Sequence, residues 1–294
     1  MDITINPLSI LQKSWEQLKN YFGRHLAIMV SLGILYFLIG FLLNALLMGG
    51  FKDQWELWQQ AASASNPNEI IMQYYMHHKG GLLINSLLSA LINIIFANLF
   101  LGYGLDTAKN RYAGFNTLLQ RYLSWKKIFH MFMLELFFIF VLFIPAFMLF
   151  FLIPLVLGKI PFLAIILDIA LVIAFLYVLV RLSLSPFYIL DRDDDFLTAL
   201  TESWNDTAPH VFSMWVFLMI IMSLGVIMLI VMVFVAAALI ALFEKVSPAM
   251  GILIFTVLYF LTIFMVELLE LFGFADYYVE ITRNEELSKE SHSS

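Results

Sequence analysis

The chain has 294 residues, of which 62% are hydrophobic and only 13% charged, and its formal net charge is -6. About a quarter of the residues in a soluble domain are charged, so this composition excludes an ordinary water-soluble fold. The chain contains no Cys, which excludes disulfides and Cys-ligated zinc or iron–sulfur centres. The acidic balance argues against a nucleic-acid partner, because phosphate binding needs a concentrated basic surface.

The apolar residues are grouped into stretches long enough to cross a bilayer. A spanning helix needs about 20 predominantly apolar residues, and six stretches meet this requirement, which predicts an all-α, polytopic membrane protein with a single transmembrane domain over residues 1–294. The fifth stretch is the longest and is expected to tilt, to break, or to continue along the membrane surface near Ala236–Ala241. The six predicted spans are Leu26–Met48, Leu82–Leu105, Ile128–Leu152, Phe162–Val180, Val211–Phe243 and Met250–Phe272.

The distribution of positive charge predicts the orientation. Residues 1–20 are polar and amphipathic and lack the short apolar core of a secretory signal, so we expect them to be retained. Twelve of the 16 Lys and Arg residues fall on the side of the membrane that carries both termini. Because Lys and Arg accumulate on the cytoplasmic side, both termini are predicted to be cytoplasmic.

A short motif occurs three times along the chain. The segment Leu8–Trp15 matches Leu197–Trp204 and, more loosely, Leu118–Trp125, and each copy precedes an odd-numbered span. Apolar residues recur at helical spacing within it, which predicts an amphipathic helix in the headgroup region. We therefore expect three helix-plus-hairpin repeats, residues 1–105, 106–190 and 191–282. Their interfacial anchors are predicted to be Trp15, Trp125 and Trp204.

Two polar regions lie outside this scheme. Residues 49–81 form an extracytoplasmic insertion, in which we expect two short interfacial helices separated at Asn66–Asn68, because Pro67 disfavours helix at the residue before it. The polar tail, residues 283–294, is predicted to be disordered.

Two segments resemble a known family. Arg181–Asp191, followed by Phe196–Trp204, is similar to a signature of YciC-like bacterial inner-membrane proteins, which are related to the membrane domain of some glycerophosphodiester phosphodiesterases. The segment Ala275–Ile281 is similar to the end of these proteins. This chain departs from the pattern at Pro145, where the family usually has Pro-Gly. The resemblance implies a multi-pass protein of the bacterial inner membrane and assigns no activity.

Ionisable residues within predicted spans are candidates for function, since a charge at the membrane centre costs roughly 3 kcal/mol. The alternative is that these residues pair with one another or extend toward the membrane surface. For Arg181, Glu267 and Glu270 we expect either pairing of the arginine with a glutamate or extension toward the membrane surface, and both the functional and the structural interpretation stay open for Asp168. Glu135 and Asp168 lie at different depths, which argues against a carboxylate pair. The candidates are Asp168, Glu135, Arg181, Glu267 and Glu270.

Asparagines in the second span are a further candidate for a polar path. Asn85 and Asn93 share a helical face, whereas Asn98 is displaced from it. Hydrogen bonds between helices explain these residues more simply. Pro145 and Pro154 are expected to kink the third span, as is common in such helices.

The remaining polar motifs favour structural explanations. The acidic residues Asp191 and Asp193–Asp195 predict a solvated turn, with Asp195 capping a helix that begins at Phe196. The adjacent His77 and His78 would point apart on a helix, so we predict no metal site. No HExxH, GxSxG, Walker or dinucleotide-binding motif is present, and no cofactor is expected.

These observations predict a non-enzymatic integral membrane protein, with a role in envelope or lipid homeostasis that follows from the resemblance and the location. The expected partners are membrane lipids and another membrane protein or a second copy of the chain. One alternative is a small-molecule or lipid transporter, which requires a polar cavity joining Asp168, Glu135 and the asparagines. The other is an intramembrane enzyme, which requires ionisable groups at one level.

Overall fold

The computed structural model describes residues 5–64, 66–111, 114–148, 153, 160–243 and 248–293. Helices account for all regular structure in these residues, and six of them are long and apolar enough to cross a membrane, which confirms the predicted number of spans. The elements are α1 (Pro7–Asn20), α2 (Phe22–Leu47), α3 (Phe51–Ser63), α4 (Pro67–His77), α5 (Lys79–Ala108), α6 (Phe115–Tyr122), α7 (Trp125–Phe147), α9 (Pro161–Leu182), α10 (Ser185–Arg192), α11 (Phe196–Asp206), η2 (Ala208–His210), α12 (Val211–Phe243) and α13 (Pro248–Ser293).

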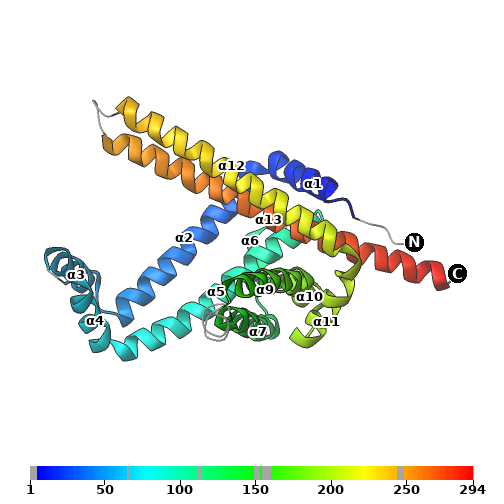
Figure 1. Ribbon diagram of the computed structural model, residues 1–294, viewed down its shortest axis with the longest axis horizontal. Helices are drawn as coiled ribbons and strands as arrows, with labels where there is room; N and C mark the ends of the chain where they lie inside the picture. Colours follow the sequence, from blue (N-terminus) through cyan, green and yellow to red (C-terminus); the bar gives the residue numbers. More distant parts are fainter. Residues whose placement is uncertain are drawn as a thin grey trace.

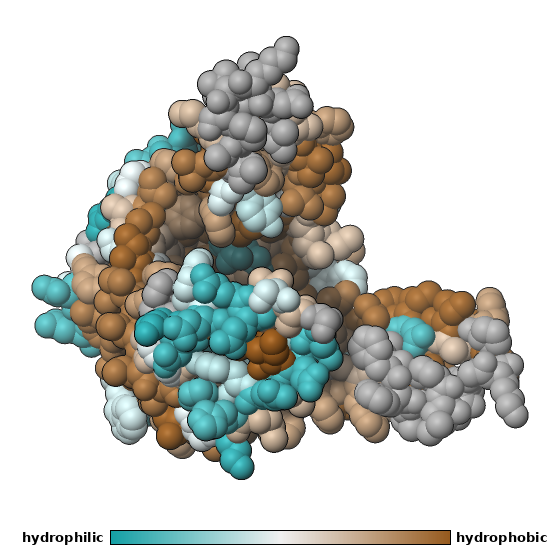
Figure 2. Space-filling view, turned by 90° about the vertical axis from the view of Figure 1, so that its left-hand side faces the viewer, coloured by the Kyte–Doolittle hydropathy of each residue, from teal (hydrophilic) through white to brown (hydrophobic). Residues whose placement is uncertain are grey.

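The long helices form three hairpins that diverge from one end of the molecule. The hairpins are α2 with α5, α7 with α9, and α12 with α13 (Figure 1). Figure 2 views the molecule from their far ends and shows a hollow between them whose walls are largely hydrophobic. Only 6% to 22% of the most apolar window of each span is buried. The spans therefore present most of their surface to the surrounding lipid.

We call the opposite end, where the helices pack together, the junction. It consists of α1, α6, α10 and α11 with the adjoining ends of the long helices, and α1 and the end of α13 both lie there (Figure 1). The largest buried side chains gather at this end. Aromatic rings account for much of this core, namely Tyr122, Tyr188, Tyr277, Tyr278, Phe187, Phe217 and Phe272.

Two glycines permit the close approach of helices in the junction. A Cβ atom on Gly102 of α5 would overlap the ring of Tyr122 from α6, and one on Gly273 of α13 would overlap the ring of Phe217 from α12. Interiors are packed too densely to absorb such an overlap without shifts of neighbouring groups. Glycine is therefore required sterically at both positions.

Side-chain caps fix where the helices of the junction begin. Asp195 accepts hydrogen bonds from the backbone N–H groups of Leu197 and Thr198, so the predicted cap of the helix at Phe196 is confirmed. Ser124 caps α7 by accepting from the N–H of Lys127. Trp125 is consequently the first residue of a spanning helix, whereas the motif predicts it within the preceding amphipathic helix.

Two other predictions about helix ends have different outcomes. The longest span forms one unbroken helix, α12, with the predicted bounds, so it does not break near Ala236–Ala241. The prediction that the tail 283–294 is disordered is wrong, because α13 continues to Ser293. The tail contains three Glu, one Leu and one Lys, whose helix propensities are high, and it extends an existing helix without a new nucleus.

The remaining predicted features lie partly outside the described residues. The insertion 49–81 contains α3 and α4, which pack together at the far end of the α2–α5 hairpin (Figure 1). Pro145 lies inside α7. Pro154 and the predicted end of the third span, residues 149–152, fall outside the described residues.

Candidate functional site

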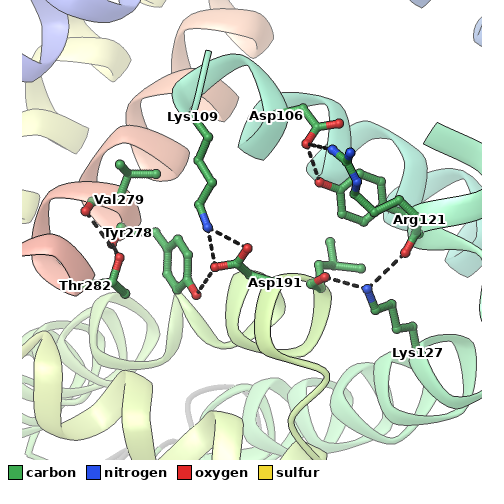
Figure 3. A network of polar contacts seen from close by, with 10 residues as sticks. Asp106, Lys109, Arg121, Lys127, Asp191, Tyr278, Val279 and Thr282 are labelled. Atoms are coloured by element: carbon green, nitrogen blue, oxygen red, sulfur yellow. Dashed lines mark hydrogen bonds and ion pairs between the residues drawn. The ribbon is translucent and has the colours of Figure 1, made fainter. Parts of the chain in front are cut away.

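Three aspartates lie in the junction, on α5, α10 and α13, at equal intervals along the sequence. They are Asp106, Asp191 and Asp276. In Figure 3, Asp106 accepts hydrogen bonds from Arg121 and from the hydroxyl of Tyr122, which lies 2.8 Å from its Oδ1. Burial, and next the charge of Asp106, raises the pKa of Tyr122, so its hydroxyl stays protonated and donates. This contact joins the end of α5 to α6.

Asp191 joins two other elements to the end of α10. Lys109, just after α5, places its Nζ 2.6 Å from Asp191 Oδ1, and the hydroxyl of Tyr278 from α13 donates to Oδ2 at 2.9 Å (Figure 3). Asp191 was predicted to lie in a solvated turn. That prediction is wrong because α10 ends against α5 and α13, where the carboxylate is mostly enclosed and ion-paired.

Asp276 is fully buried and holds α1 against α13. Lys13 Nζ lies 2.8 Å from its Oδ1, while the Ser14 hydroxyl and the Gln17 amide donate to the carboxylate at 3.1 and 3.3 Å. Lys13 and Ser14 each lie on the same side of α1 as Gln17, because they precede it by four and three residues. The carboxylate is therefore compensated entirely by a helix from the other end of the chain.

Lys127, the third residue of α7, ties α6 to α10. Its buried Nζ donates to the carbonyl oxygens of Arg121 and Leu190, at 2.9 and 2.7 Å (Figure 3). It also lies 3.2 Å from Asp193 Oδ1. A buried ammonium is stable only when its donors are satisfied. Lys127 thus acts as a structural cross-link between the second and third connecting regions of the chain.

The structure shows no pairing of Arg181 with Glu267 or Glu270, which was one of the two structural arrangements expected for these residues. Arg181 instead donates to the backbone carbonyl of Trp204 and to the hydroxyl of Tyr177, and its guanidinium lies 4.3 Å from the centre of the Trp204 ring. Trp204 is on α11, which packs against α9 and places Trp204 beside Arg181. Glu267 and Glu270 lie on exposed parts of α13.

The other polar residues predicted within spans lie on different hairpins. Asn93 of α5 accepts a hydrogen bond of 2.7 Å from Tyr36 of α2, which supports the packing explanation for this residue. Glu135 lies on α7 and Asp168 on α9, both partly buried. Asn85 lies near the far end of α5. Within the described chain, no hydrogen bond or ion pair joins any of these residues to another.

The three predicted anchors are all exposed at the junction. The exposed fraction of the side chain is 48% for Trp15, 77% for Trp125 and 38% for Trp204. The opposite face of α1 is buried, since Ile10, Ser14 and Leu18 are at most 2% exposed. The indole rings are therefore accessible to the surroundings, while their helices pack on the protein.

A lateral groove lies between the first and third hairpins, beside the junction. It has a volume of about 880 Å³ and is lined by α2, α5 and α13. Gly33 and Ala97 leave space in its walls, while Phe260 and Phe264 line the α13 side. Glu267 is its one ionisable lining residue. In an apolar environment this groove is complementary to hydrocarbon.

Most residues of the junction were not predicted from the sequence. Asp106, Asp276 and Lys127 were not singled out, although the equal spacing of the three aspartates was a detectable signal. The groove had no signal, because its walls come from helices far apart in the sequence. Among the described residues, no group of three or more His, Asp or Glu side chains is placed to bind a metal ion.

Six apolar helices in three hairpins define the general class: this is a helical, multi-pass membrane protein. No family model matches the chain, and neither the curated proteins nor the solved structures contain a significant match to it.

Proposed function

We propose that this chain is a non-enzymatic integral membrane protein that binds membrane lipid in the groove between α2, α5 and α13, with a role in envelope or lipid homeostasis. The groove carries the proposal. It is large enough for acyl chains, its walls are almost entirely apolar, and it opens beside spans that are themselves mostly exposed. An apolar groove at membrane depth fills with lipid, because no water is present there to fill it.

The polar residues favour this function over transport or intramembrane catalysis. A transport path needs polar groups that connect, and an intramembrane active site needs ionisable groups that converge. Asn93 is bonded within its own hairpin and lies outside the cavity between α12 and α13 that Glu267 and Glu270 line; Glu267 also lines the lipid groove. The aspartates of the junction are paired with cations.

The proposal includes an internal threefold repeat of a connecting helix followed by a hairpin. Two observations support it. An aspartate lies in the junction on each of α5, α10 and α13, namely Asp106, Asp191 and Asp276, and each of these helices packs on a connecting helix: α5 on α6, α10 on α11, and α13 on α1. Superposition of the three units tests the repeat, which would be rejected if their helices did not align.

The proposed setting is the bacterial inner membrane, with the junction and both termini in the cytoplasm. The excess of Lys and Arg at the junction supports this orientation, and the resemblance to YciC-like proteins supports the location. Reporter fusions at both termini and at Asn66 test the topology. An extracytoplasmic signal from either terminus would contradict it.

The groove is tested by counting phospholipids that remain bound to the purified chain, by native mass spectrometry. Gly33→Phe and Ala97→Phe fill the groove and should each reduce the number retained. Gly40→Phe is the matched control, because Gly40 lies on the same helix but outside the groove and has open space at its Cβ position. Equal retention by all variants and the parent chain would contradict lipid binding at this site.

A further inference from the structure

A further cavity opens at the junction, on the side of α1. Its volume is about 520 Å³, and α1, the end of α5 and the end of α13 contribute its lining. It shares no lining residue with the lipid groove. The charged lining residues are four cations, Lys13, Lys109, Arg111 and Arg283, and one acid, Glu280.

The two lysines are held in place by neighbouring acids. Lys13 lies 2.8 Å from Asp276 and 3.5 Å from Glu280, and Lys109 lies 2.6 Å from Asp191. These contacts largely neutralise the lysine charges. Each ammonium has three N–H donors, and these pairs fix the position of the nitrogen beside the cavity.

The two arginines supply the charge that is not compensated. Among the described side chains, neither Arg111 nor Arg283 has an ion pair or a hydrogen bond, and both are exposed. The backbone of Arg111 is nevertheless fixed, because Asn110 adopts a left-handed conformation and the N–H of Arg111 donates to the carbonyl of Asp106 at 2.7 Å. This turn ends α5 and directs the chain along the cavity.

The chemistry of this lining fits a phosphate group. Guanidinium groups bind phosphate through two parallel N–H···O bonds, and such charge-assisted bonds are about twice as strong as neutral ones. Clustered cations repel one another, so a bound anion would stabilise the arrangement. The cavity also lies where two candidate spans end, at Ala108 and Asn284, which is the depth of lipid headgroups.

We infer that this cavity is an anion site that binds a phosphate group, with Arg111 and Arg283 as its principal ligands and the lysines beside them. The phosphate belongs either to an anionic lipid headgroup or to a free phosphate in solution. The site does not depend on the lipid groove.

The full chain in nanodiscs of zwitterionic lipid provides the test, with two probes added separately: a short-chain phosphatidylglycerol and inorganic phosphate. At least one probe should bind to the parent chain, and R111Q/R283Q should weaken that binding about tenfold or more. Binding of phosphatidylglycerol alone would identify a headgroup site, whereas binding of inorganic phosphate would identify a site for free phosphate.

The control variant K19Q/K126Q removes the same charge from exposed positions at the junction and should leave binding unchanged. Failure of both probes to bind, or equal weakening in the two double variants, would overturn the inference. If R111Q/R283Q does not fold, R111K/R283K is used instead. It retains both charges but loses the two-bond geometry, so binding should weaken several-fold, and binding equal to that of the parent chain would overturn the inference.

Discussion

Replacement of Asp276 should release α1 from the junction. This carboxylate is fully buried on α13, and its partners Lys13, Ser14 and Gln17 all lie on α1. Asp276→Ala removes the acceptor for all three. Asp276→Asn keeps an acceptor oxygen in nearly the same place but removes the charge, so the two variants separate hydrogen bonding from ion pairing.

The contacts give the expected size of the effect. In the alanine variant the buried Gln17 amide loses its partner, at a cost of about 1–3 kcal/mol for an unsatisfied donor. Lys13 is about one-third exposed and also contacts Glu280, so losing its ion pair with Asp276 costs about 1 kcal/mol after solvent screening. Ser14 still donates to the Ile10 carbonyl. The total is about 3 kcal/mol for alanine and about 1 kcal/mol for asparagine.

Thiol labelling measures this release, because the chain contains no Cys. Ile10, which is 2% exposed on α1, is replaced by Cys as a reporter in the parent chain and in both variants. Labelling then reports the population in which α1 has opened. The alanine variant should label about 100-fold faster than the parent, and the asparagine variant roughly fivefold faster. Labelling rates within twofold of the parent in both variants would refute the assignment of Asp276 as the contact that holds α1.

Other parts of the structure give further expectations. Gly102→Ala should lower the free energy of unfolding by about 1–3 kcal/mol, because the new methyl group overlaps the Tyr122 ring. Gly80→Ala is the control, since there is open space at its Cβ position and no loss is expected. Equal melting temperatures for the two variants would contradict the steric account. Hydrogen bonds from Thr198 hold the pKa of Asp195 below its ordinary value of 3.8, so the cap is fully formed above that value and is lost as the pH falls through the lowered pKa. Amide exchange in the first turn of α11 should therefore stay slow near neutral pH and accelerate only in strong acid. Acceleration near neutral pH would disprove the role of the ionised Asp195 as the cap. Asp168→Asn should preserve expression and thermal stability, since no partner of Asp168 is lost, and a large fall in stability would show that its charge supports the fold.

The spans and local caps could be predicted because they depend on nearby residues. The bounds of α12 follow from an uninterrupted apolar stretch, and the cap at Asp195 follows from a preference that acts over three residues. The tail was missed because disorder was inferred from polarity alone, while helix propensity and the preceding span extend α13 to Ser293.

The candidate site could not be predicted in the same way, since it depends on contacts between distant segments. Lys13 and Asp276 are near opposite ends of the chain, and nothing in the local sequence of either indicates its partner. Arg181 illustrates the same limit. Charge alone favoured a glutamate partner, but helix packing places the ring and carbonyl of Trp204 beside it.

The divergence of the hairpins has a consequence for tolerance of mutation. Most side chains along the spans have lipid rather than protein as their neighbour, as Leu46, Phe162 and Phe234 illustrate with exposed fractions of 79%, 76% and 72%. Exchange of one apolar residue for another at such positions alters no internal contact and leaves the cost of membrane insertion nearly unchanged. Homologous sequences can therefore diverge rapidly along the hairpins while conserving hydropathy, and detectable identity should be concentrated in the short segments that build the junction.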